Sequence, residues 1–103
     1  MPERGSVERV LALAPDAASA VAARRLANPG PWQETGASGD LVWGHCRGTG
    51  ITPYRVVAEL TGRGGACSCP SRKSPCKHVL ALLLLAATGQ VPEAGEPAGF
   101  AAA

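Results

Sequence analysis

A cluster of three cysteines and one histidine constrains the fold of this chain more than any other feature. Cys67 and Cys69 are two positions apart, six residues follow, and Cys76 and His78 are again two positions apart. In an extended chain, residues i and i+2 point to the same side, so the first two thiols can converge. Residues i and i+2 of a helix do not face each other. Cys76 must therefore lie at or before the start of a helix whose first turn holds His78.

These four side chains match the donor set of a closed, tetrahedral zinc site. Soft sulfur ligands disfavour magnesium and calcium, and they leave iron as the alternative metal. Cys67 and Cys69 are too close to form an unstrained disulfide, although either could pair with Cys76. A redox-active thiol would need only one cysteine of low pKa, with no histidine at this spacing. The sequence predicts one structural Zn²⁺ held by Cys67, Cys69, Cys76 and His78.

The composition gives such a metal a large role in stability. Hydrophobic residues make up 46% of the 103 positions but aromatic residues only 4%. Much of the apolar content is alanine, which buries little area. Packing in a domain this small rarely supplies more than about 5 kcal/mol, whereas structural zinc in finger peptides binds with roughly 10–16 kcal/mol. We expect the metal to decide whether the middle of the chain folds.

The same composition limits where the chain functions. Four cysteines are too few for a disulfide-built secreted scaffold, and the first residues show no secretory signal. The longest apolar run, residues 79–87, is nine residues long and too short to cross a bilayer. We expect a reducing, cytoplasmic compartment and no membrane partner.

Residues 1–30 are predicted to form a helical hairpin. Ser6 is the expected N-cap of the first helix, and Pro15 is expected to open the second, with Asp16 in its first turn. The apolar stripes that indicate these helices are thin: Val7, Val10, Leu11 and Ala14 in the first, and Ala18, Val21, Ala22 and Leu26 in the second. Because the second stripe is mostly alanine, we expect the hairpin to dock on a larger body.

The rest of the chain predicts an α+β fold. Residues 31–40 have the composition of a loop, and residues 41–46, 53–61 and 66–69 are predicted strands. The helix after Pro75 has no polar side chain from 79 to 87, so it must be covered on several sides. The expected architecture is a small zinc-bound finger over residues 41–88, a short antiparallel β-sheet with a buried helix, and an N-terminal helical hairpin. Residues 89–103 are predicted to be a flexible linker or tail, and the chain is expected to be a piece of a longer protein.

The motif also resembles a known family. Cys-x-Cys, a short spacer and Cys-x-His leading into an apolar helix are similar to the SWIM zinc finger, and the likeness covers residues 54–84. The segment CSCPSRKSPCKHVLALLLL is similar to bacterial members, and residues 8–32 resemble the N-terminal helical region of longer actinobacterial SWIM proteins. The resemblance implies a β-hairpin-plus-helix finger with structural zinc, and a role in binding DNA or proteins.

Charge suggests which partner to test first. The chain carries a net charge of only +2, but residues 41–80 hold six cations against Glu59. Lysine and arginine supply the salt-dependent part of nucleic-acid affinity, so Arg72, Lys73 and Lys77 are the predicted nucleic-acid contacts. The alternative is a module that binds only protein, as an adaptor within a longer chain, with basic residues that merely balance the zinc thiolates.

Catalysis is not expected. The sequence has no phosphate-binding glycine loop and no paired carboxylates, and a zinc ion with four protein ligands has no open position for water. We therefore expect no small-molecule substrate. His45 and Cys46 lack the partners for a second metal site, and the simpler interpretation is a satisfied strand histidine and a small buried thiol.

Overall fold

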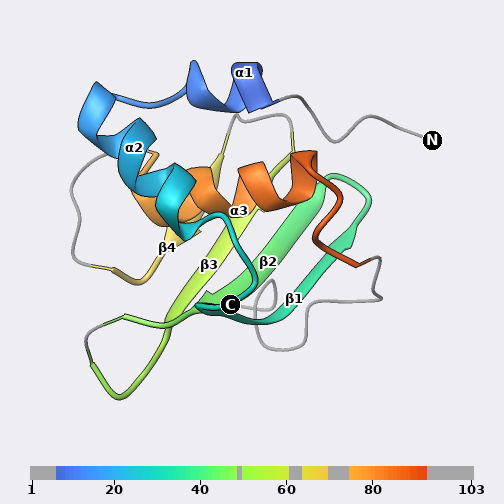
Figure 1. Ribbon diagram of the computed structural model, residues 1–103. Coiled ribbons are helices and arrows are strands. Elements are labelled where there is room, and N and C mark those ends of the chain that lie inside the picture. Colours follow the sequence, from blue (N-terminus) through green and yellow to red (C-terminus); the bar gives the residue numbers. More distant parts are fainter. Residues whose placement is uncertain (1–6, 49, 61–63, 70–74, 93–103) are drawn as a thin grey trace.

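The computed structural model describes residues 7–48, 50–60, 64–69 and 75–92 (Figure 1). It contains an antiparallel sheet with the strand order β1-β2-β3-β4, and three helices lie on one face of that sheet. This arrangement confirms the predicted α+β class. The elements are α1 (Val7–Leu11), α2 (Ala17–Leu26), β1 (Trp32–Ser38), β2 (Leu41–Cys46), β3 (Tyr54–Glu59), β4 (Gly65–Cys67) and α3 (Lys77–Ala87).

The helix α3 forms the centre of the molecule. It contacts β2, β3 and β4 on one side and α1 and α2 on the other, so it lies between two layers (Figure 1). Its buried residues are His78, Val79, Leu80, Ala81, Leu82, Leu83, Leu84, Leu85 and Ala86. A helix that is apolar all round is stable in water only when it is enclosed in this way. The predicted burial of this helix between the sheet and the hairpin is confirmed.

Alternate residues of the central strands face α3. Val42 and Cys46 of β2 and Val56 and Ala58 of β3 are fully buried in the same core cluster as α3. In β3, Arg55 and Glu59 are exposed and Val57 is only half-buried. Strand β3 thus shows the period of two expected for a strand with one buried face, whereas in β2 Trp43 on the opposite face is buried as well. The predicted strand over 41–46 is found with these bounds, and the predicted strand over 53–61 is shortened to Tyr54–Glu59.

The expectation of a loop over residues 31–40 was wrong. Most of this segment is β1, which pairs with β2 from Trp32 opposite Cys46 to Ser38 opposite Leu41. The pairing shifts register between Gln33 and Gly36, where Glu34 has a φ of 54°. Tertiary contacts override the loop-like composition, because Trp32 is buried in the core and its indole N–H donates to the carbonyl oxygen of Leu26 at 2.8 Å.

The hairpin is present, but its details differ from the prediction. Asp16, not Pro15, sets the start of α2, since its side chain accepts a hydrogen bond from the Ser19 N–H at 2.7 Å. The buried face of α2 consists of Ser19 and Ala23, while Val21, which was predicted to face inward, is exposed. Ala18, another member of the predicted stripe, is exposed as well. The predicted N-cap Ser6 lies outside the described residues.

The predicted tail begins later than expected. Val91 is buried in the core cluster, and the carbonyl oxygen of Pro92 accepts a hydrogen bond from the Ala37 N–H of β1 at 3.0 Å. The chain after α3 is therefore held against the sheet as far as Pro92, and residues 93–103 lie outside the described residues. Among the residues that the structure describes, no helix is both long enough and apolar enough to cross a membrane.

Candidate metal centre

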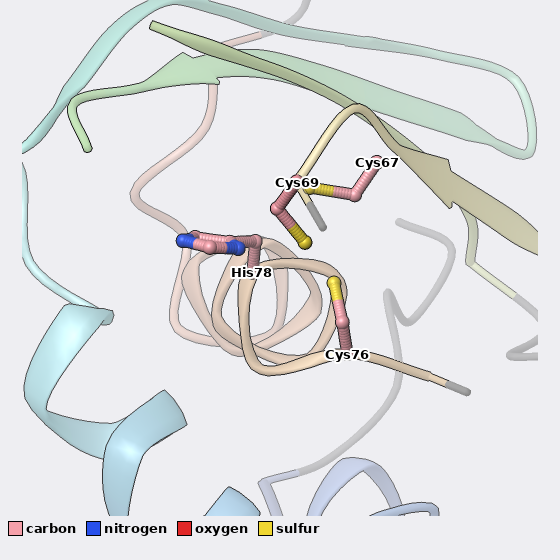
Figure 2. Close-up of side chains that lie close together, drawn as sticks. All are labelled: Cys67, Cys69, Cys76 and His78. Atoms are coloured by element: carbon pink, nitrogen blue, oxygen red, sulfur yellow. The ribbon is translucent and has the colours of Figure 1, made fainter. Parts of the chain in front are cut away.

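The four predicted ligands come from two separate parts of the fold. Cys67 ends β4 and Cys69 lies two residues beyond it, whereas Cys76 is the N-cap of α3 and His78 is in its first turn. The three sulfur atoms lie close together beside the start of α3, and Figure 2 shows one nitrogen of the His78 ring on their side while the rest of the ring points away. One ligand atom from each residue lies within 4.8 Å of all the others. The site thus joins the edge of the sheet to the central helix.

His78 supplies an independent test of whether this set fits a metal. Its side chain is buried, and its Nδ1 atom has no hydrogen-bond partner among the described residues. A buried polar atom without a hydrogen-bond partner destabilises the folded state unless another group, such as a metal ion, binds it. A zinc ion bound by Nδ1 would remove that cost. The ring of Tyr54 lies against the imidazole, with 4.9 Å between centroids, and restricts its rotation. The four residues fit one structural zinc ion.

The cluster favours the thiolate form of one cysteine and the protonated form of another. The pKa of Cys76 is lowered to about 3, chiefly because it accepts a hydrogen bond from the Cys67 thiol, with a further contribution from His78. The pKa of Cys67 is raised, because that hydrogen bond holds its proton and burial disfavours its charged form. The metal-free cluster therefore keeps a proton between these two sulfurs. Zinc, which binds thiolates, must displace it.

We therefore expect zinc affinity to fall as the pH is lowered. Each proton that zinc displaces weakens binding by about tenfold per unit of decreasing pH. The raised pKa of Cys67 extends this dependence through neutral pH, because Cys67 still holds its proton there. Competition with a chelating dye between pH 8 and pH 5 measures the effect. An affinity that does not change over this range would contradict it.

Cys46, the remaining cysteine, lies outside the cluster. It is fully buried, and burial together with the nearby charge of Cys76 raises the pKa of its thiol to about 11. It behaves as the small buried hydrophobe that was predicted. Its neighbour His45 has a partner that the sequence did not reveal, because Nδ1 lies 2.9 Å from Oε2 of Glu34. Glu34 lies where the pairing of β1 with β2 is irregular, and no sequence motif indicates its contact with His45.

Of the three predicted nucleic-acid contacts, only Lys77 belongs to the described residues. Lys77 is exposed and directly follows the ligand Cys76. Arg72 and Lys73 lie outside the described residues. The structure does bring Lys77 close to a second cation that was not predicted, since Lys77 and Arg25 of α2 line the same surface groove.

Comparisons with known proteins agree with this geometry. Residues 54–87 match the family model described as the SWIM zinc finger. The matched segment begins at Tyr54, which packs on the ligand His78, and ends with α3, so it contains the whole metal cluster. No curated protein and no solved structure matches the chain. The segment from residue 54 to residue 87, whose Cys₃His cluster fits one structural zinc ion, is therefore similar to the SWIM zinc finger.

Proposed function

We propose that this protein is a nucleic-acid-binding module whose zinc ion is structural and whose contacts are made mainly to phosphates. The observation that supports this proposal is the distribution of charge along the sheet. Arg47 and Arg55 are exposed at the end of the sheet where β2 ends and β3 begins. Asp40 and Glu59 are exposed at the opposite end, where β2 begins and β3 ends.

The basic end of the sheet is also the zinc end. Ser68, which lies between Cys67 and Cys69, donates its backbone N–H to the carbonyl oxygen of Arg55 at 3.1 Å. On the helical side, Lys77 follows Cys76 and adds a further exposed cation. A zinc ion in this cluster would therefore tie the segment beside Arg55 to the segment that carries Lys77. In this proposal the metal orders a basic surface and takes no part in catalysis, because four protein ligands leave no coordination position for a substrate.

Glu34 is the acidic residue described at this end of the sheet. Its Oε2 atom is engaged with His45, so that carboxylate has a partner within the protein. No exposed row of aromatic side chains accompanies the cations among the described residues. Stacking on single-stranded bases is therefore not favoured, and phosphate contacts to a duplex suit the surface better.

Titration of the zinc-loaded protein with duplex DNA of mixed sequence, followed by amide chemical shifts, tests the proposal. We expect shifts at Arg47, Arg55 and Lys77 that weaken as salt rises from low to physiological concentration. Lys77→Gln and Arg47→Gln should each weaken binding several-fold and lower the salt slope by about 1. Zinc content is measured on every sample, so loss of the fold is not mistaken for loss of a contact.

Arg9→Gln is the matched control, because it removes the same charge from α1, away from the basic end of the sheet. It should leave DNA binding almost unchanged. Equal effects of Arg9→Gln and Lys77→Gln would show a nonspecific response to net charge and would contradict the proposed surface. The absence of any shift at low salt would contradict nucleic-acid binding itself and favour the alternative, a module that binds only protein.

A further inference from the structure

A groove on the surface of α2 is not explained by the zinc site or by the basic end of the sheet. It has a volume of about 470 Å³ and is open to solvent. It is lined by Ala18, Val21, Ala22, Arg25, Leu26 and Lys77. The lining therefore combines an aliphatic floor from one face of α2 with two cations, one of which belongs to the first turn of α3.

The most exposed apolar side chain of this groove, Val21, does not belong to the core cluster, although Leu26 at its edge packs against that cluster. The helix packs on α3, and its fully buried positions are Ser19 and Ala23. Val21 lies elsewhere on the helix, and 52% of its surface is exposed. A single exposed aliphatic residue is ordinary, but Val21 lies in a concave surface with the half-buried Ala22 and Leu26, and such a surface beside charged residues is typical of one that binds a partner.

The charges of the groove indicate the chemistry of that partner. Arg25 and Lys77 are both exposed, and Arg24 precedes Arg25 in the last turn of α2. None of the described residues that line the groove is acidic. A ligand that fills it therefore meets positive charge above an apolar floor, and charge complementarity favours a partner that carries carboxylates beside aliphatic side chains.

We propose that this groove, defined by the six lining residues above, docks an acidic peptide segment of a partner protein. Aliphatic side chains of the peptide pack on Val21, Ala22 and Leu26, and its carboxylates pair with Arg25 and Lys77. A nucleic acid fits less well, because phosphates would lie over the aliphatic floor without burying it. The volume suits a few side chains, which is the scale of an amphipathic peptide.

This interaction is separate from the proposed nucleic-acid contact, although Lys77 takes part in both. Val21 and Leu26 have no role in phosphate binding, and Arg47 and Arg55 have none in the groove. The two proposals can therefore fail independently, and variants at Val21 and Arg47 tell them apart.

Selection of peptides from a random library on the intact, zinc-loaded chain tests the proposal without assuming a particular partner sequence. We expect the enriched peptides to be acidic and to carry aliphatic residues at helical spacing. Val21→Glu should weaken their binding at least tenfold, because it places a carboxylate on the apolar floor. Arg25→Gln should weaken it several-fold and reduce its dependence on salt.

Leu13→Glu is the matched control, because Leu13 is a partly exposed aliphatic residue outside the groove. It introduces the same side chain as Val21→Glu and should leave peptide binding unchanged. Enriched peptides that lack negative charge, or that bind the Val21→Glu variant as well as the original protein, would overturn the proposal. Failure to enrich any peptide, or DNA-induced shifts at Val21 that match those at Arg47, would overturn it as well.

Discussion

Removal of zinc is expected to unfold residues 54–88, and Cys76→Ser should have the same effect. The metal joins the end of β4 to the first turn of α3, and without it these two segments lose their link. Structural zinc in finger peptides contributes roughly 10–16 kcal/mol of apparent binding free energy. Packing in a domain this small contributes about 5 kcal/mol at most. Loss of the metal therefore removes more free energy than the rest of the fold can supply.

The loss should spread beyond the finger itself. The helix α3 is the surface on which α1 and α2 pack, so those helices lose their partner when α3 unfolds. Amide spectra recorded with and without a strong chelator, together with metal analysis, measure the effect. We expect dispersed signals from one equivalent of zinc per chain and collapsed signals in the chelated sample.

Cys46→Ala provides the control for this experiment. It also removes a cysteine, but one whose thiol lies outside the metal cluster. This variant should retain one zinc ion and a dispersed spectrum, with only the modest cost of losing a small buried side chain. Retained dispersion in the chelated protein would show that the core folds without the metal and would contradict a structural role for zinc.

Leu82→Ala is expected to destabilise the zinc-loaded protein by about 2–5 kcal/mol. Leu82 is fully buried in the middle of α3. Its truncation leaves a cavity within the core cluster that the two layers enclosing the helix cannot easily close. Denaturant unfolding at saturating zinc measures the change as a lower midpoint.

Val21→Ala on α2 serves as the comparison for that measurement, because Val21 is about half exposed. It should change the free energy of unfolding by no more than about 0.5 kcal/mol. Similar losses for the two variants would show that α3 is not the centre of the core. A loss below about 1 kcal/mol for Leu82→Ala would lead to the same conclusion.

The metal cluster and the buried helix could be predicted because their signals are local. The spacing of Cys67, Cys69, Cys76 and His78 is compatible with only a few backbone paths, and the structure brings these residues together. The apolar run from 79 to 87 likewise allows no solvent-exposed face, so its burial follows from composition alone. In both cases the physical constraint lies within a short stretch of chain.

The strand β1 could not be predicted, because nothing within it requires a strand. Its glycine, serine and glutamate residues are typical of a loop, and pairing with β2 provides the hydrogen bonds that make it extended. The contact between Glu34 and His45 depends on the same pairing. The buried face of α2 was predicted only in part, since Leu26 packs against the core beside the buried Ser19 and Ala23, whereas Ala18 and Val21 are exposed.

The sequence by itself determined the metal, its ligand set and the helix that must be buried. These properties follow from donor chemistry and from the hydrophobic effect acting on neighbouring residues. Only the tertiary structure decided that β1 joins the sheet, that Arg47 and Arg55 share the zinc end, and that Val21 and Arg25 lie in one groove with Lys77. Those properties depend on contacts between distant segments, whose geometry arises only when the core has formed.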